Sequence, residues 1–404
     1  MIEVKGKYNT AIIFTDEVDE VTMSQVTELL NQEFTAGSQI RIMPDCHAGI
    51  GCVIGTTMTI TDKVVPNLVG VDIGCGLDVI KLGQIEINLI KLDEFISNNI
   101  PSGFDVNQKV LDDSIDLSKL KCYDQLRNKN YLMRSIGSLG GGNHFIEIDL
   151  DDEGNKYLII HSGSRNLGTQ VAEYYQREAV KYHQNQIFDI KKEKLRIIEE
   201  YTISGRQKEI DKALKKLSKT KVRIGMPETL AYLEGDLFND YLHDMEICQK
   251  FASKNREVMA KTILKYLNLD YESLPKFETI HNYINIRDMI LRKGAISAYK
   301  GERVIIPINM KDGCIIAIGK GSKEFNYSAP HGAGRLMSRR EALNTLSLKD
   351  FKESMKEIYL TSVSKDTLDE APFVYKPIEM ILENIKDTVK VEKIIKPIYN
   401  FKAK

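Results

Sequence analysis

The chain has 404 residues, enough for one large domain or two ordinary ones. Its 56 basic and 57 acidic side chains nearly cancel, so an anionic partner has to be gripped by local charges. There is no charged-then-apolar leader and no apolar run near ~18 residues, so we expect a soluble, cytoplasmic protein with no membrane partner. Six cysteines without a CxxC pair do not form a disulfide framework, and we expect Cys122, Cys248 and Cys314 to be small core residues.

Residues 1–168 are expected to be rich in strands, because short apolar runs alternate with glycine. Examples are AIIFTD, SQIRIMPD, GCVIGTTMTITD and LVGVDIGCGLDVIKLG. Two stretches with helical spacing, about 22–34 and 88–99, interrupt these strands.

Residues 169–269 have a different character, being charged and poor in glycine. Their apolar stripe predicts helices, which we expect to form an antiparallel hairpin that projects from the sheet core. The basic stretch 205–223 inside this segment is interpreted as a solvated helix face. The stripe consists of Tyr241, Met245, Cys248, Ala252, Met259, Ile263 and Tyr266.

Strands return in residues 277–320, with RVIIPINM and GCIIAIGKG as the clearest runs. Helices are expected at about 338–360 and 376–386, and KIIKPIYNF predicts a final strand. Internal repeats and low-complexity linkers are absent from the sequence. We therefore predict one α+β catalytic domain over residues 1–404, with a β-rich core and 169–269 as an inserted helical hairpin.

Five of the seven histidines lie in the β-rich parts close to Gly, Asn or Pro, and two of these can be related by geometry. HFIEIDL and YLIIHS alternate like strands, and DDEGNK between them predicts a hairpin loop. A loop centred near 153–154 places His161 opposite Ile146, within two positions of His144. Both imidazoles then lie at the open end of one ribbon, close enough to share a metal ion or to bind adjacent ions.

Asp72 and Cys75 lie in the stretch NLVGVDIGCGLDVI, spaced like ligands around a glycine turn. A buried carboxylate and thiolate are tolerable when cations lie between them. Asp, Cys and His together suit Zn, Mn, Fe or Co and do not choose among these metals. A thiolate also bridges two ions, and paired ions are a common device for phosphoryl transfer.

Two further stretches suit phosphate. Residues 161–175 run from a strand through a small-residue loop into a helix, where Arg165 and backbone amides would suit an anion, although no Walker GK[ST] is present. Residues 327–335, YSAPHGAGR, place His331 among small residues with Arg335 nearby, which is typical of a nucleophile loop. The structural alternative is a glycine-rich turn before a helix.

With these segments in view, the sequence resembles the RtcB family of RNA ligases. The resemblance rests on MPDCHAGIG, GVDIGCGL, GGGNHFIE, HSGSRNLG, HNYI, RKGA, GKG…NYSAPHGAGR and a lysine near the C-terminus, in that order along most of the chain. It implies an enzyme that joins an RNA 3′-phosphate or 2′,3′-cyclic phosphate end to a 5′-hydroxyl, in RNA repair or tRNA splicing. It also implies two Mn²⁺ ions and GTP as cofactors.

Carried over position by position, the resemblance assigns one manganese to Asp72, Cys75 and His144. The second manganese would be held by Cys75, His161 and His281, with Cys75 as the bridge. His331 matches the histidine that becomes covalently guanylated.

The resemblance also implies a nucleotide pocket and a set of phosphate or RNA contacts. The pocket residues are Asn143, Phe145, Glu147, Asn282, Pro307, Met310, Gly332, Ala333, Gly334 and Lys402, of which Lys402 would recognise guanine. The phosphate or RNA contacts are Arg165, Lys293 and Arg335. Asp45 and His47 match a family signature without an assigned role. This chain has PINM where the family has a PGSM-like turn, so Asn309 is the candidate to replace the usual serine.

Two other classes of protein compete with the ligase. A dinuclear metallohydrolase, such as a phosphatase or phosphodiesterase, would use the same Asp, Cys and His ligands but would not need His331 outside them. A non-catalytic RNA-binding subunit would use the basic stretch 205–223 and would need none of the site residues. The sequence does not identify the physiological RNA, the oligomeric state or an accessory protein.

Overall fold

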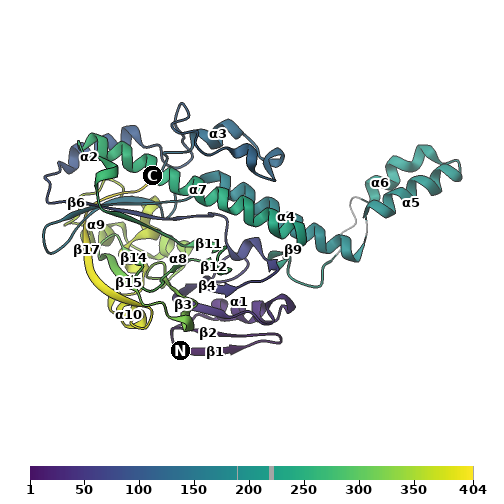
Figure 1. Cartoon of the computed structure of the whole chain (residues 1–404), viewed down its shortest axis with the longest axis horizontal. Helices are drawn as coiled ribbons and strands as arrows, with labels where there is room; N and C mark the ends of the chain where they lie inside the picture. Colours follow the sequence, from purple (N-terminus) through teal and green to yellow (C-terminus); the bar gives the residue numbers. More distant parts are fainter. Residues whose placement is uncertain (189, 218–222, 404) are drawn as a thin grey trace.

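The computed structural model describes residues 1–188, 190–217 and 223–403 (Figure 1). One large sheet has six strands in the order β1-β2-β3-β4-β12-β11, in which only the β2–β3 pair is parallel. Its strands are β1 (Ile2–Lys5), β2 (Thr10–Ile13), β3 (Ile40–His47), β4 (Ile54–Thr59), β12 (Ile290–Lys293) and β11 (Asn282–Asn285).

The second large sheet has seven antiparallel strands in the order β10-β6-β8-β7-β17-β15-β14. Its strands are β10 (Lys276–Ile280), β6 (Gly76–Gly83), β8 (Lys156–Ser162), β7 (Phe145–Leu150), β17 (Val389–Phe401), β15 (Gly313–Gly319) and β14 (Arg303–Asn309). Two small pairs complete the strands, namely β13 (Ala295–Ser297) with β16 (Ser328–Pro330), and β5 (Lys63–Val64) with β9 (Leu233–Glu234).

Ten α-helices accompany these sheets in the described part of the chain, so the α+β class predicted from the sequence is confirmed. They are α1 (Glu20–Leu30), α2 (Leu89–Asn99), α3 (Lys129–Arg134), α4 (Arg165–Ile187), α5 (Ile190–Ile203), α6 (Ile210–Leu217), α7 (Gly235–Tyr266), α8 (Arg339–Thr345), α9 (Leu348–Ser354) and α10 (Ile378–Asn384). The 3₁₀ turn η5 (Gln207–Glu209) lies between α5 and α6, and the 3₁₀ turn η9 (Lys365–Glu370) comes between α9 and α10. Among the described residues, no helix combines the length and apolar character needed to cross a membrane.

Helix α7 lies against the sheets, which differs from the projecting hairpin expected for 169–269. Met245 joins the apolar cluster of the six-stranded sheet, and Met259 joins the cluster over β6, β7 and β8. The stripe is buried as predicted except for Tyr266, which is 36% exposed and stacks on Phe95. The physical reason is that so long an apolar stripe is stabilised by covering a sheet face.

Figure 1 shows α4 running beside α7, while α5 and α6 extend away from the body. These two outer helices pack on each other and on η5. That 169–269 is an insertion within the catalytic domain stays a prediction, and part of the stretch 205–223 lies outside the described residues.

The β7–β8 hairpin has a register one position away from the expected one. Leu150 pairs with Lys156 across the turn, so His161 lies opposite Phe145 and not opposite Ile146. Directly paired residues share a face of the sheet. The His161 and Phe145 rings consequently meet, with centroids 5.2 Å apart, and His144 comes just before β7.

The same end of the seven-stranded sheet gathers three chain segments. Gly76, the first residue of β6, pairs with Ser162 on one side and with Ile280 on the other. Cys75 and His281 therefore lie beside the end of β8 that carries His161. His281 also separates β10 from β11, so it lies where the two large sheets are joined.

Candidate functional site

The five side chains expected to hold metal meet in two groups of three that share one cysteine. The Sγ atom of Cys75 lies 3.4 Å from Nε2 of His144 and 3.4 Å from Nε2 of His161. On one side, His144 Nε2 is 3.0 Å from Oδ2 of Asp72. On the other side, His161 Nε2 is 3.1 Å from Nε2 of His281.

The ligand types in this cluster suit cations, and the Cys75 thiol gives up its proton when it binds one. Burial, reinforced by neighbouring histidines, lowers the pKa of His161 and His281 well below the usual range, so both imidazoles are neutral. Burial and the Asp72 carboxylate raise the pKa of the Cys75 thiol. Although burial opposes ionisation of Asp72, its contacts with His144 lower its pKa. Neutral nitrogen donors around a shared sulfur and a carboxylate fit a pair of divalent cations.

The ligand loops are held by contacts from outside the cluster. His144 Nδ1 lies 2.9 Å from the Leu139 carbonyl, which fixes the tautomer and leaves Nε2 for the cluster. A Cβ on Gly163 would collide with the Asp72 carboxylate, which explains the glycine in HSGS.

Arg256 on α7 is a supporting residue that sequence reasoning missed, because α7 was interpreted only as a core stripe. Its fully buried guanidinium donates to the carbonyls of Gly74, at 3.0 Å, and Ser162. It also pairs with Glu278 at 2.6 Å. Arg256 therefore fixes the backbone of the residue before Cys75 and of the residue after His161. A charged residue inside an apolar helix stripe is the signal that could have found it.

His331 lies outside both triads but directly beside one of them. Its Nδ1 is 2.7 Å from Oδ2 of Asp45, and its ring stacks on His281 with centroids 4.8 Å apart and 23° between the planes. With Nδ1 bonded to a carboxylate, the Nε2 lone pair is the one available for attack. Gly334 has a φ of +74°, and a Cβ there would collide with the Asp45 backbone. Sequence reasoning assigned no role to Asp45, and the structure makes it the partner of His331.

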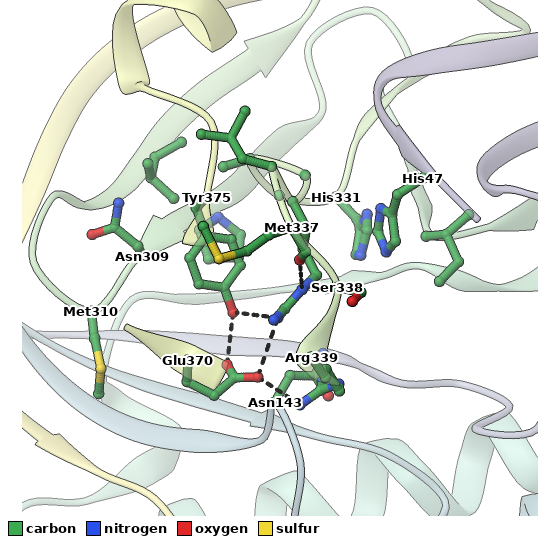
Figure 2. A pocket seen from close by; sticks show the side chains of 18 of the residues that line it. His47, Asn143, Asn309, Met310, His331, Met337, Ser338, Arg339, Glu370 and Tyr375 are labelled. Atoms are coloured by element: carbon green, nitrogen blue, oxygen red, sulfur yellow. Dashed lines mark hydrogen bonds and ion pairs between the residues drawn. The ribbon is translucent and has the colours of Figure 1, made fainter. Parts of the chain in front are cut away.

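A pocket of about 880 Å³ opens beside His331 (Figure 2). Nine of the ten expected nucleotide residues line it, namely Asn143, Phe145, Glu147, Pro307, Met310, Gly332, Ala333, Gly334 and Lys402. The tenth, Asn282, does not line the pocket. Its side chain accepts from the Gly294 amide at 2.9 Å and donates to the Asp72 carbonyl at 3.2 Å, so it joins the ligand loop to β12.

The inner end of the pocket combines an acid, a base and an aromatic ring. The Lys402 ammonium lies 5.8 Å from the Phe145 ring centroid. Glu147 accepts a hydrogen bond from Asn400, and burial raises its pKa to about 7 although Asn400 and Lys402 oppose the shift. Cys314 is buried, as predicted, and it lies beside Glu147 as part of the lining.

Two of the three expected phosphate contacts, Arg165 and Lys293, do not line the pocket, and both are engaged by protein groups. Arg165 donates to the Gly103 carbonyl at 2.8 Å, and its charge contributes to lowering the pKa of Asp72. Lys293 donates to the Asn67 carbonyl at 2.8 Å and to the Ile50 carbonyl, and burial lowers its pKa to about 8. The structure does not bring Lys293 to the pocket.

The remaining expected residues lie on the pocket wall. Arg335 lines the pocket and donates to the Asp369 carbonyl at 2.6 Å. Asn309 also lines it, but its side-chain oxygen accepts from the amides of Lys311 and Asp312, so it builds its own turn. His47 faces the same space beside His331 (Figure 2).

A buried Asp/Cys/His cluster, an oriented histidine beside it and a pocket of nucleotide size are typical of a metal-dependent enzyme that uses a nucleotide. The family model described as "tRNA-splicing ligase RtcB" matches residues 25–132 and 118–403. The chain therefore belongs to the RtcB family.

Curated relatives come from distant organisms and cover the chain at nearly full length. The "RNA-splicing ligase RtcB" of Escherichia coli (strain K12) is 28% identical over an alignment of 391 residues that covers 87% of each chain. The "tRNA-splicing ligase RtcB" of Aeropyrum pernix is 25% identical over 468 residues, covering 92% of this chain and 90% of the relative. The protein of the same name from Methanococcus maripaludis is 26% identical over 437 residues, covering 86% and 84%.

Proposed function

We propose that this chain is an RNA ligase that uses GTP and two Mn²⁺ ions to join a 3′-phosphate or 2′,3′-cyclic phosphate end to a 5′-hydroxyl end. The observation that carries the proposal is His331, held by Asp45 outside both triads and stacked on His281. A dinuclear phosphatase or phosphodiesterase would use such a histidine only as a general acid, whereas the ligase uses it to carry GMP, so covalent labelling separates the two. The cytoplasmic location expected from the sequence is part of the same proposal.

His331 is placed to act as the nucleophile. Its Nε2 lone pair attacks the α-phosphorus of GTP, so an N–P bond forms while the bond to the leaving pyrophosphate breaks. Nδ1 keeps its proton and donates it in a hydrogen bond to the Asp45 carboxylate. This carboxylate stabilises the positive charge that develops on the ring. Bound manganese would neutralise phosphate charge during this attack. The GMP group then passes to the RNA 3′-phosphate, and the 5′-hydroxyl displaces GMP to form the phosphodiester; a cyclic phosphate is first opened by water.

The pocket suits guanine at its inner end. An ionised Glu147 would accept hydrogen bonds from N1–H and the 2-amino group, and Lys402 would donate to O6. Both side chains line the pocket that opens at His331. Arg165 and Arg335 are proposed to meet phosphate or RNA by exchanging some of their present bonds. For Lys293 the geometry supports a structural task in holding two carbonyls.

The first test is covalent labelling in the absence of RNA. Purified protein incubated with α-labelled GTP and Mn²⁺ is expected to retain label through denaturing electrophoresis, in a bond that is labile in acid and stable in alkali. His331→Ala should carry no label and should bind both metal ions. Label that persists in His331→Ala, or that is absent from the wild type loaded with metal, contradicts the proposed mechanism.

The second test addresses the substrate. An RNA cut to leave 2′,3′-cyclic phosphate and 5′-hydroxyl ends is expected to be rejoined when GTP and Mn²⁺ are both present. Release of inorganic phosphate or a ring-opened product without joining would instead identify a metallohydrolase. Comparing a cleaved tRNA with a cleaved unstructured RNA distinguishes splicing from general repair and shows whether an accessory protein is needed.

A further inference from the structure

Glu370, at the end of η9, is a buried carboxylate in the wall of the pocket, only 4% exposed. Three cations and a phenol converge on it, of which Arg339 and Tyr375 are labelled in Figure 2. Lys402 Nζ lies 2.8 Å from one carboxylate oxygen, and the Tyr375 hydroxyl donates to the same oxygen at 2.7 Å. Arg339 and Arg335 approach the other oxygen at 2.9 and 3.6 Å.

This cluster keeps Glu370 ionised. Burial alone would favour the neutral acid, but Lys402, Arg339 and Tyr375 together lower the pKa of Glu370 to about 2. The charge is therefore a permanent part of the pocket over the working pH range.

Lys402 depends on this carboxylate. Its side chain is 5% exposed, and among the described residues Glu370 supplies the one hydrogen-bond acceptor for its ammonium. An ammonium has three N–H donors, so two remain available after Glu370 takes one. A buried ammonium without a partner is costly, so the Lys402 side chain is stabilised in this position by Glu370.

We propose that Glu370 is a positioning residue that gives the pocket its preference for guanine by holding the Lys402 ammonium in place. This inference rests on the proposed function, in which Lys402 meets guanine O6. A fixed ammonium offers only donors, so it pairs with the 6-oxo group of guanine or hypoxanthine and opposes the 6-amino group of adenine. An ammonium that is no longer held against Glu370 would lose this discrimination between the two bases.

The experiment measures His331 labelling without RNA, as a function of the concentration of α-labelled GTP, ITP or ATP. In Glu370→Gln, the KM for GTP and for ITP should rise about tenfold or more, while the labelling rate at saturating GTP changes less than about twofold. The ratio of His331 labelling by GTP to labelling by ATP should also fall in this variant. Glu353→Gln is the control, because Glu353 is an exposed acid on α9 that pairs with Lys356.

A double-variant cycle separates action through Lys402 from a general structural effect. Glu370→Gln combined with Lys402→Ala should be no worse for GTP than Lys402→Ala alone, because the two residues act as a unit. If the two effects multiply, or if Glu370→Gln leaves the GTP-to-ATP ratio unchanged, Glu370 does not act through Lys402 and the inference is overturned.

Two further readouts keep the outcomes distinct. If Glu370→Gln does not fold, Glu370→Asp takes its place. Aspartate keeps the negative charge but moves it one methylene away from Lys402, so the ratio of GTP to ATP use should fall. An unchanged ratio overturns the inference. A wild-type protein that contains metal but takes no label from any nucleotide contradicts the proposed function itself, which is a different result from labelling without base preference.

Discussion

Cys75 is the side chain that both candidate metal triads have in common. Cys75→Ser should therefore reduce the metal bound per chain at both sites and abolish His331 labelling, because a serine hydroxyl is a poor bridging ligand. Metal analysis after gel filtration, with circular dichroism as a measure of folding, checks this result. Cys122→Ser is the matched control, since Cys122 is equally buried but lies in the apolar core. Two bound ions and normal labelling in Cys75→Ser would exclude a bridging role.

Glu147 gives the pocket a pH dependence. Burial raises the pKa of this carboxyl to about 7, so its proton returns as the pH falls through 7. A protonated carboxyl loses the acceptor pair that guanine N1–H and the 2-amino group need. The ionised fraction falls about tenfold between pH 8 and pH 6, so the KM for GTP in the labelling reaction should rise by about the same factor.

The check on Glu147 is a KM profile across this pH range for the wild type and Glu147→Gln. The variant should bind GTP weakly with a flat profile, because its amide does not titrate. A wild-type KM that is constant from pH 6 to 8 would show that Glu147 stays ionised throughout, or that it does not meet the base.

At the scale of elements, α5 and α6 are separable from the site. They pack on each other and on η5, while α4 and α7 carry the contacts to the sheets. Replacing residues 190–217 with a Gly/Ser linker should leave His331 labelling within about twofold and shift Tm by only a few degrees. Labelling and a thermal scan check this, and joining of RNA ends is measured in parallel. A loss of labelling would show that these helices support the pocket.

Local sequence patterns predicted most elements, because periodicity and turn residues act over a few positions. They did not predict how α7 is used, since a stripe such as Met245 to Met259 does not say which sheet it covers. The β7–β8 register was missed by one position because the exact closure of a turn depends on its own hydrogen bonds, here donated by Asn155 to the Asp151 carboxylate.

At the scale of the whole molecule, bound metal ions should stabilise the junction between the two large sheets. His281 joins β10 to β11, and it meets Cys75 and His161 from the seven-stranded sheet. Ions that bind only the folded chain stabilise it by about 2.7 kcal/mol per site at ~100 times Kd. Adding Mn²⁺ to chelator-treated protein should therefore raise Tm by a few degrees, and chelation should reverse the rise.

The His281 contribution is isolated by substitution. His281→Ala should lose part of the Mn²⁺-dependent rise in Tm. His183→Ala should keep all of it, because His183 lies on α4 with its ring nitrogen 2.9 Å from the Tyr232 carbonyl, away from the cluster. An equal rise in wild type and His281→Ala would mean that His281 does not hold metal.

The site shows what a single sequence reveals about distant residues. The resemblance to the RtcB family assigned the five cluster residues and His331, and the structure brings them together. It did not reveal the partnership of Asp45 with His331, which lies 286 positions away, nor the dependence of Lys402 on Glu370. Such pairings depend on how whole sheets pack, and short-range chemistry carries no information about them.

The contact of His331 with Asp45 and His281 also bears on how the attack responds to temperature. The ring is held at one edge by a carboxylate and at one face by a second imidazole before any nucleotide arrives. Its rotational freedom is therefore given up when the chain folds, and little remains to be lost on reaching the transition state. The entropy of activation contributed by the nucleophile should accordingly be small, which leaves the barrier to guanylation mainly enthalpic.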